Sequence, residues 1–314
     1  MVRQRSAKSL YGGSIPPQAS FHNCNQNSMG NLVNRVDQYY IDTAWDYKHL
    51  WIGKALAVHF GYYDDRAISH NTALLNMNEV LAKKANIQNN EKIIDAGCGI
   101  GGSSIWLAKT KNCEVVGLNI VDWQIKEAFL NASHAGVSDK VHFIKADYAH
   151  VPLCDHTFNV FWALESLVHA QRKEDVIREA HRLLNDDGRI VIAEYMLREN
   201  PTLNHEEYKF LNPWLKGWSM PDLLTSSNYE EYLRSAGFTN IQKFDIGRNV
   251  CHSLQRLKWL CRLALPGAMM MESLGLFTKG RVANIKGSLR QISTFKKGYW
   301  SYYIIVATKA ATYI

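Results

Sequence analysis

The segment Ile93–Gly101, with the sequence Ile-Ile-Asp-Ala-Gly-Cys-Gly-Ile-Gly, constrains the fold of this chain more than any other feature. Its two β-branched residues predict a buried strand with Asp95 at its carboxyl end, and the apolar stretch from Ile105 predicts a helix after the glycines. Glycine suits such a turn because a Cβ atom would keep the backbone away from a bound ligand. The segment therefore predicts a strand–turn–helix unit that holds a ligand. The alternative is a glycine-rich turn without one.

The position of the acid relative to the glycines indicates the kind of ligand. Asp95 precedes the glycines Gly97, Gly99 and Gly101. In the dinucleotide-binding fingerprint, by contrast, the glycines face a pyrophosphate and the acid follows about 20 residues later. An acid at the mouth of the turn favours a ligand that has a cationic or hydroxyl-rich end and no phosphate.

Strands and helices alternate after this unit. The predicted strands are Glu114–Leu118, Val141–Lys145, Phe158–Leu164 and Arg189–Tyr195, the last after a loop at 185–188, and the predicted helices are Asp122–Ala135 and Lys173–Leu184. This alternation predicts an α/β fold with a doubly wound, mostly parallel, Rossmann-like sheet. Ligands of such sheets bind beyond the carboxyl ends of the strands. The polar residues at those ends are Asp95, Asn119, Asp147 and Glu165.

The regions around this predicted core differ in composition. Residues 1–30 are rich in Ser, Gly, Asn and Gln and predict a flexible arm. We expect a helical, aromatic lid at 31–86, the core at 87–200, an inserted helical block at 201–290, and a last segment at 291–314. In that last segment the alternating run Trp300–Thr308 predicts a strand that completes the sheet as a hairpin.

Composition indicates a globular protein without a membrane span. Of the 314 residues, 46% are apolar and 21% are charged, and no run of 18 uncharged apolar residues occurs. Met1–Lys8 carries charges with no apolar core behind it, which does not fit a secretory signal. The six cysteines are scattered without a C-x-x-C pair. We expect a cytoplasmic protein with free thiols, and the sequence leaves open whether it forms a homo-oligomer.

Four segments together point to a known family: His59–Asp64 (HFGYYD), Ile93–Gly101, Gly117–Gln124 and Ala163–Ser166 (ALES). They resemble the class I S-adenosylmethionine (SAM)-dependent methyltransferases, most of all the branch of tocopherol, sterol and prenyl-diphosphate C-methyltransferases. The resemblance implies SAM as the cofactor and a substrate cap at residues 201–290. The wider class usually has an acid after the second strand, where this branch carries a small polar residue followed by a glutamine.

The resemblance and the predicted strand ends assign one side of the site to the cofactor. Asp95 is expected near the methionine amine, Asn119 and Gln124 near the ribose, and Asp147 with Tyr148 near the adenine. The complete predicted cofactor set is Tyr39, Tyr40, Asp95, Gly97, Cys98, Gly99, Gly101, Asn119, Ile120, Gln124, Asp147, Tyr148 and Leu164. Cys98 is a small residue that fills the turn and is given no chemistry.

Two residues after the fourth predicted strand are candidates for catalysis. Glu165 lies where the methyl group of SAM is expected, and in the resembling prenyl-diphosphate enzymes the glutamate of this Glu-Ser motif looks to be the base. The alternative for Glu165 is a structural hydrogen bond to the amino-terminal helix. His169, four residues on, either shares the site or is a buried histidine of the core.

The inserted block and the segment after it are strongly basic. Between Lys243 and Trp300 there are eleven Lys and Arg residues and two acids, a local net charge of +9. This pattern predicts either a solvated basic face or an anionic partner such as a diphosphate, a carboxylate or an acidic lipid surface. Nucleic acid is disfavoured because the basic residues interleave with aromatic ones. The predicted substrate-binding residues are Trp45, Trp218, Arg248, His252 and Arg256.

These features predict a SAM-dependent C-methyltransferase of a lipophilic isoprenoid, best a prenyl diphosphate, with Glu165 as base. A diphosphate substrate would bring Mg²⁺ with it, and no metal ligands of the protein are predicted. Alternative acceptors are a prenylquinol, a tocopherol-like ring, a sterol, or the N or O atom of a small natural product. A second class of function is a SAM-binding regulatory or scaffold protein without turnover.

Overall fold

The computed structural model describes residues 26–67 and 69–311. The predicted flexible arm at 1–30 therefore lies, up to residue 25, outside the described residues. The helices are α1 (Gln26–Asp46), α2 (His70–Lys84), α3 (Gly102–Lys111), α4 (Asp122–Ala135), α5 (Lys173–Leu183), α6 (His205–Gly217), α7 (Ser226–Ser235), α8 (Gly247–Ser273) and α9 (Lys279–Lys296). The strands are β1 (Lys92–Ala96), β2 (Glu114–Asn119), β3 (Val141–Lys145), β4 (Phe158–Leu164), β5 (Leu184–Leu197), β6 (Phe238–Asp245) and β7 (Trp300–Lys309).

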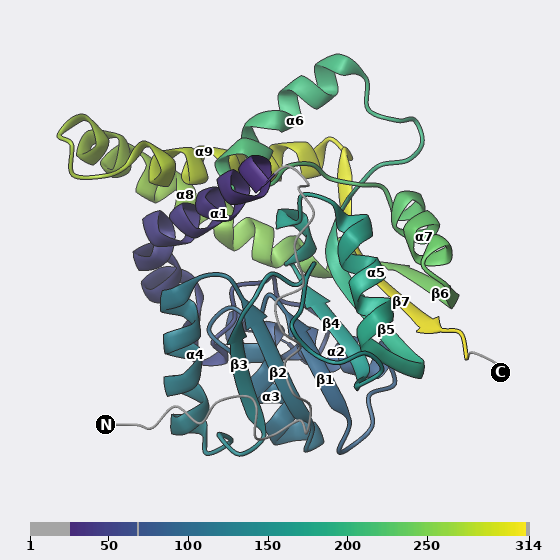
Figure 1. Cartoon of the computed structure of the whole chain (residues 1–314). Coiled ribbons are helices and arrows are strands. Elements are labelled where there is room, and N and C mark those ends of the chain that lie inside the picture. The colour runs from purple at the N-terminus through teal and green to yellow at the C-terminus, as the bar shows by residue number, and fades with distance from the viewer. Residues whose placement is uncertain (1–25, 68, 312–314) are drawn as a thin grey trace.

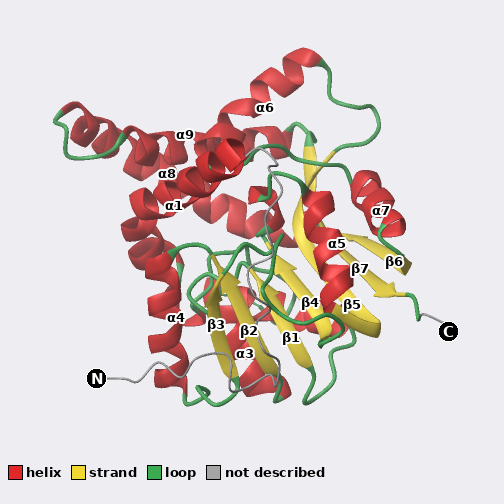
Figure 2. Cartoon of the chain, in the orientation of Figure 1, coloured by secondary structure: helices red, strands yellow, loops and turns green. Residues whose placement is uncertain are grey.

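The described strands form one sheet with the order β3-β2-β1-β4-β5-β7-β6. Strands β1 to β5 pair in parallel, and β7 lies antiparallel between β5 and β6. The predicted α/β fold with a mostly parallel sheet and a final antiparallel hairpin is therefore confirmed. Figure 2 shows helices on both faces of this sheet.

Alternation along the strands explains the two helical layers. Ile93 packs with α2, α3 and α4 in one core, whereas its neighbour Ile94 packs with α5 and α7 in the other. Both residues are fully buried, as strands covered on both faces require. The helices on both faces of the sheet fix the carboxyl ends of β1, β2 and β4 at one edge, where the turns that follow these strands meet.

Two elements differ from the sequence prediction. Strand β5 begins at Leu184, so the predicted loop at 185–188 lies inside the strand as a bulge, with Asp187 in the left-handed region at φ 60°. The block at 201–290, expected to be a helical cap, also contains β6, which pairs with β7 at the edge of the sheet. The helical cap is therefore formed by α6, α8 and α9, and along the chain the α7–β6 unit separates α6 from the other two helices.

Helices α1, α6, α8 and α9 gather above the carboxyl ends of the parallel strands (Figure 1). Helices α6 and α9 approach closely at Gly217, where a Cβ atom would lie 2.5 Å from the carbonyl oxygen of Ala283. Glycine at this crossing lets the two backbones meet. The four helices thereby enclose the space in front of the sheet edge where the predicted site residues lie.

Candidate active site

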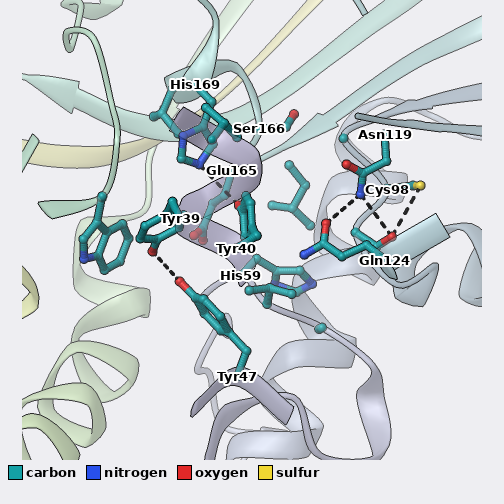
Figure 3. A pocket seen from close by; sticks show the side chains of 18 of the residues that line it. Tyr39, Tyr40, Tyr47, His59, Cys98, Asn119, Gln124, Glu165, Ser166 and His169 are labelled. Carbon is teal, nitrogen blue, oxygen red and sulfur yellow. Dashed lines mark hydrogen bonds between the residues drawn. The ribbon is translucent and has the colours of Figure 1, made fainter. Parts of the chain in front are cut away.

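A cavity of about 740 Å³ lies between the carboxyl ends of the strands and the four covering helices. Figure 3 shows side chains from α1, from the glycine turn and from the end of β4 converging on it. The predicted site residues that line this cavity are Tyr39, Tyr40, Asp95, Gly97, Cys98, Gly99, Asn119, Ile120, Gln124, Asp147, Tyr148, Leu164, Glu165, His169 and Trp218. The structure thus brings together residues from widely separated parts of the sequence.

The glycine turn forms one wall of the cavity. The backbone amides of Gly97 and Cys98 both donate to the carbonyl oxygen of Leu118, at 3.0 and 2.9 Å, which ties the turn to β2. Gly97 has φ 85°, and a Cβ atom there would lie 2.4 Å from the Cβ atom of Ser166. Only glycine fits this position, since both its backbone conformation and its neighbour exclude a side chain.

Asp95 is the acid at the base of this turn. Its side chain is buried and accepts a hydrogen bond of 2.6 Å from the hydroxyl of Ser104. Burial raises the pKa of Asp95 to about 6, and the hydrogen bonds from Ser104 offset part of that shift. A cationic group in the cavity would favour the ionised carboxylate, so Asp95 suits the ammonium of a bound amino acid.

Asn119 and Gln124 form a neutral amide pair beside the turn. The Asn119 side-chain amide donates to the carbonyl oxygen of Gly99 at 3.2 Å and to Oε1 of Gln124 at 2.7 Å. The Gln124 nitrogen points away from Asn119, toward the side of the cavity where His59 lies (Figure 3). Asn119 therefore positions the turn and the glutamine, and the Gln124 amide is left to donate to a ligand hydroxyl.

The residues predicted for the adenine side lie after β3. One carboxylate oxygen of Asp147 accepts from the amide of Ala149 at 2.9 Å, and the Tyr148 hydroxyl donates to the carbonyl oxygen of Ser166 at 2.9 Å. These bonds hold the β3 and β4 ends together and leave the second Asp147 oxygen for a donor in the cavity. Together with Asp95 and Gln124, this wall fits SAM, which has an ammonium, a ribose and an adenine to be recognised.

Glu165 follows β4 and stands in the cavity with a left-handed backbone at φ 52°. Such a conformation is strained for a residue other than glycine and occurs often at functional sites. Its Oε1 accepts from the Phe60 amide at 2.6 Å and from the Tyr302 hydroxyl at 2.8 Å, and its Oε2 accepts from the Tyr195 hydroxyl. Glu165 therefore ties the segment before α2 to β5 and β7.

Despite these hydrogen bonds, the Glu165 carboxyl has a pKa that allows it to act as a base near neutral pH. Burial raises the pKa of Glu165 to about 7, although its three hydrogen bonds act in the opposite direction. The neighbouring Glu194 is also buried, and burial together with the negative charge of Glu165 raises its pKa well above the usual range. Of the two carboxyls, Glu165 is the one that lines the cavity.

Tyr40 of α1 and His169, which follows β4, lie together at the wall of the cavity. The Tyr40 hydroxyl lies 3.3 Å from Nε2 of His169, and Nδ1 of His169 lies 3.5 Å from the carbonyl oxygen of Ser219. Burial lowers the pKa of His169 to about 4, so its ring is neutral at pH 7. With its proton on Nδ1, His169 accepts from Tyr40 and orients the tyrosine oxygen at the cavity wall.

The other end of the cavity is mainly apolar. Leu257, Leu260, Cys261 and Ala264 of α8 and Ile285 of α9 form this wall. Most of its polar groups are neutral: the Tyr39 hydroxyl shares a 2.7 Å hydrogen bond with Tyr47 and donates to Asn284 at 3.2 Å, and the Trp218 indole donates to Ser288 at 3.1 Å. Among the described residues, the one charged group of this end is the Asp46 carboxylate, which is paired with Arg281 of α9. This end suits an acceptor that is large, apolar and without net charge.

Five of the predicted residues lie outside the lining of the cavity, so the structure does not support a ligand contact for them and that contact stays a prediction. Trp45 is 54% exposed and stacks on His49. Arg248, His252 and Arg256 lie on the outer face of α8, because they recur at helical spacing opposite the face that packs inward. Gly101 caps α3 beside Phe143, so its left-handed φ of 89° serves packing.

His59, Tyr47 and Asn284 are among the cavity residues that the sequence prediction missed. His59 is buried with Nε2 unpartnered among the described residues, and burial lowers its pKa to about 4, so Nε2 is a free acceptor. Its position inside the HFGYYD segment was the available signal. Tyr47 and Asn284 come from α1 and α9 regions that no motif marks. Their approach to the site depends on tertiary packing.

Within the described part of the chain, no group of three or more His, Cys, Asp or Glu side chains is arranged to hold a metal ion. None of the described helices is both long enough and apolar enough to cross a membrane. Among the Lys and Arg side chains of the described residues, only Arg172 lines the cavity, and it is paired with Glu174 and Asp175 at 3.4 Å each. Among the residues that the structure describes, the cavity therefore offers an anion no unpaired cation.

Residues 87–237 match a methyltransferase domain family. The chain is 31% identical to the 27-O-demethylrifamycin SV methyltransferase of Amycolatopsis mediterranei over 57% of its length and 65% of that relative. It is 29% identical to a sterol 24-C-methyltransferase of Saccharomyces cerevisiae over 54% of its length and 44% of the relative. The chain thus spans less than two thirds of the length of either protein.

A solved structure has a similar fold. Geranyl diphosphate C-methyltransferase from Streptomyces coelicolor, in complex with Mg²⁺, geranyl-S-thiolodiphosphate and S-adenosyl-L-homocysteine, superposes with a TM-score of 0.68 at 14% identity. The superposition covers 89% of this chain and 98% of the other. The likeness is one of fold, and it extends over the covering helices as well as the sheet.

Proposed function

We propose that this chain, which belongs to the class I SAM-dependent methyltransferases, transfers a methyl group to a carbon atom of a neutral, lipophilic acceptor of the sterol or isoprenoid type. The observation that carries the proposal is the position of Glu165. A half-buried carboxylate with a pKa near 7 stands between the wall proposed for the cofactor and a wall that is apolar and aromatic. Carbon methylation requires such a base, since the methylated carbon must lose a proton.

The acceptor wall supports a neutral substrate over a prenyl diphosphate. The basic residues that the sequence offered for a diphosphate lie outside the cavity, and Arg172 is paired with acids. A diphosphate buried without cations would carry a large desolvation cost. Mg²⁺, which a diphosphate would bring with it, has no role in the neutral case. The similarity to sterol 24-C-methyltransferases agrees with a neutral acceptor but does not identify it.

Different residues of the chain then have different roles in the reaction. SAM, when bound, supplies an electrophilic methyl group on its sulfonium. Asp95, Gln124 and Asp147 bind the cofactor, while the apolar wall on α8 aligns the acceptor carbon and excludes water. The aromatic faces of Tyr39, Tyr40 and Trp218 shelter the positive charge that develops on the acceptor. Glu165 takes the proton on a carboxylate oxygen.

O-methylation of a natural product is the second candidate. The Tyr40–His169 pair favours it, because the Tyr40 hydroxyl, which the neutral His169 ring orients, can form a hydrogen bond to an acceptor hydroxyl at the cavity wall. The similarity to a 27-O-demethylrifamycin SV methyltransferase agrees with this candidate. The two candidates differ in their dependence on Glu165, since an oxygen acceptor depends less on a strong base for its proton.

An acceptor screen with methyl-labelled SAM tests the proposal. The purified chain is incubated with sterols, tocopherols, prenylquinols, macrocyclic natural products, amines, and geranyl and farnesyl diphosphates, and labelled products are separated by mass spectrometry. We expect transfer to a carbon of a neutral polycyclic or isoprenoid acceptor without added metal. Turnover restricted to the diphosphates, with dependence on Mg²⁺, would overturn the neutral assignment. SAM binding without turnover on any acceptor would favour a regulatory protein.

A charge substitution separates the two kinds of acceptor further. Arg248→Glu reverses a charge on the outer face of α8, where we expect no contact with the acceptor. The KM for a detergent-dispersed neutral acceptor should therefore stay within about twofold of wild type, since an exposed charge this far from the ligand is screened. Steady-state kinetics at physiological salt check this. A large rise in KM with unchanged SAM affinity would instead indicate that Arg248 contacts the acceptor.

A further inference from the structure

The outer face of α8 carries an apolar stripe that nothing in the described chain covers. Trp259 is 63% exposed, Leu263 is 77% exposed, and Met270 and Leu274 follow at 60% and 63%. The spacing of four, seven and four residues places all four on one side of the helix. Single exposed apolar residues are ordinary, but a contiguous row of this kind marks an interaction surface. In Figure 1, α8 and α9 project past α1, with their connecting turn at the tip.

Basic side chains flank this stripe without acidic partners. Lys258, Arg262 and Lys296 lie close enough that the positive charge of Arg262, and then that of Lys296, lowers the pKa of Lys258. None of the three forms an ion pair with an acid among the described residues. From Gly247 to Lys297, Glu272 is the one acid. Like charges held this close cost free energy unless an anionic surface compensates them.

We infer that the α8–α9 hairpin docks on an anionic lipid surface, with the stripe in the interface and the basic residues on the headgroups. An apolar row that ends in a tryptophan and is flanked by unpaired Lys and Arg is the pattern of a helix lying in a membrane interface. Spanning the bilayer is not required, and no described helix is apolar enough for it. A nucleic acid would match the charge but not the leucine and methionine side chains.

The opposite face of the same helix lines the cavity. Leu257 and Leu260, next to Trp259 in sequence, belong to the apolar acceptor wall. A hairpin seated on a bilayer would hold this wall close to the lipid, which would shorten the path of a lipophilic acceptor out of water. This consequence rests on the proposed function, whereas docking itself does not, and the two are tested separately.

Vesicle sedimentation tests the docking without any methyl transfer. The full chain is mixed with vesicles of phosphatidylcholine alone or of phosphatidylcholine and phosphatidylglycerol, at low and at high salt. We expect binding to the anionic vesicles that weakens as salt screens the basic residues. Two variants remove the two parts of the surface: Trp259→Ser with Leu263→Ser, and Lys258→Glu with Arg262→Glu. Each should weaken partitioning by about tenfold or more, because each changes two interfacial residues.

Matched controls separate docking from general surface effects. Leu130→Ser removes a 56% exposed leucine on α4, and Lys109→Glu reverses a charge on α3. Both helices lie beside the sheet and do not belong to the α8–α9 hairpin (Figure 1). Both variants should bind vesicles like wild type. Circular dichroism melting shows whether each variant is folded.

Several outcomes would overturn the inference. Binding equal for both vesicle types, or unaffected by the hairpin variants, would do so. So would a wild-type dimer in light scattering that Trp259→Ser with Leu263→Ser converts to a monomer while vesicle binding is absent, since the stripe would then face a second copy. SAM turnover on a detergent-dispersed acceptor, measured in the same variants, reports the proposed function independently and should be unchanged.

Discussion

Replacing Glu165 by glutamine should lower the turnover number by a factor of about 10²–10⁴, the usual range for the loss of a general base. The loss should appear in kcat, with SAM affinity nearly unchanged, because the carboxylate acts on the acceptor proton. Single-turnover kinetics with labelled SAM and calorimetric titration of SAM measure the two effects. The product distribution is also informative, since a cation without its base can lose a different proton.

The structure indicates that Glu165→Gln can keep the hydrogen bonds of the side chain while it removes the basic carboxylate. The glutamine carbonyl can keep the hydrogen bonds from the Phe60 amide and the Tyr302 hydroxyl, which both reach Oε1. The glutamine nitrogen can donate to the Tyr195 oxygen, because a phenol hydroxyl accepts as well as donates. The substitution therefore retains the link between the lid segment and the sheet and removes the basicity alone.

The pH profile gives a second readout of the same residue. With a pKa of about 7, Glu165 is mostly protonated below neutral pH and cannot act as a base. Turnover by the wild type should therefore rise with pH through about 7 and then level off, and Glu165→Gln should lack this limb. Near-normal turnover to the same product by the variant would remove the base assignment and the main reason for preferring carbon as the acceptor atom.

Stability should change in the opposite direction to activity. A carboxyl whose pKa is raised from 4.5 to about 7 on folding binds more protons in the folded state, so its contribution to stability falls as pH rises through that window. At pH 8 the wild type holds a half-buried negative charge there and the glutamine variant does not. Thermal melting of Glu165→Gln at pH 8 should give a midpoint no lower than that of the wild type.

The core and the grouping of polar residues at the strand ends were predictable because they depend on local patterns and on the topology of the sheet. The Ile93–Gly101 segment specifies a strand, a turn and a helix by period and by glycine. In a parallel sheet the ends of β1, β2, β3 and β4 meet at one edge, so Asp95, Asn119, Asp147 and Glu165 came together by topology alone. The bulge in β5 was not predictable, because an Asn-Asp-Asp-Gly run is typical of an open loop.

The acceptor wall was not predictable from the sequence. The basic residues at Arg248, His252 and Arg256 share one face of α8, but the sequence does not say whether that face turns inward. Packing decides it: Leu257, Cys261 and Ala264 face α9 and the cavity. The charged row therefore lies on the other side of α8, where Arg256 donates to the carbonyl oxygen of Leu50 at 2.9 Å and His252 packs against Tyr63. Tyr47 and Asn284 likewise reach the site through the crossing of α1 and α9, a contact between residues more than 200 positions apart.

Replacing Asp95 by alanine should abolish measurable SAM binding, with an affinity loss of about 10²-fold or more. A buried ammonium that loses its carboxylate partner leaves an uncompensated charge, which costs about 3–5 kcal/mol. The Asp95 carboxylate is itself buried beside the glycine turn, so water cannot easily replace it. Isothermal titration calorimetry of the folded variant with SAM measures the loss, and a circular dichroism melt confirms that the sheet is intact.

The control for this prediction is Ser104→Ala, which removes the 2.6 Å hydrogen bond to Asp95 and keeps the carboxylate. If Asp95 binds the cofactor, Ser104→Ala should weaken SAM binding far less than Asp95→Ala does. If Asp95 only braces the turn through Ser104, the two variants should behave alike.

The pH dependence of SAM binding is a further test. Burial raises the pKa of Asp95 to about 6, so its carboxylate accepts a proton as the pH falls. SAM binding by the wild type should therefore weaken below that pH. Affinity retained in Asp95→Ala, or independent of pH across this range, would move the ammonium contact to another group, of which the unpartnered Nε2 of His59 is the nearest candidate by chemistry.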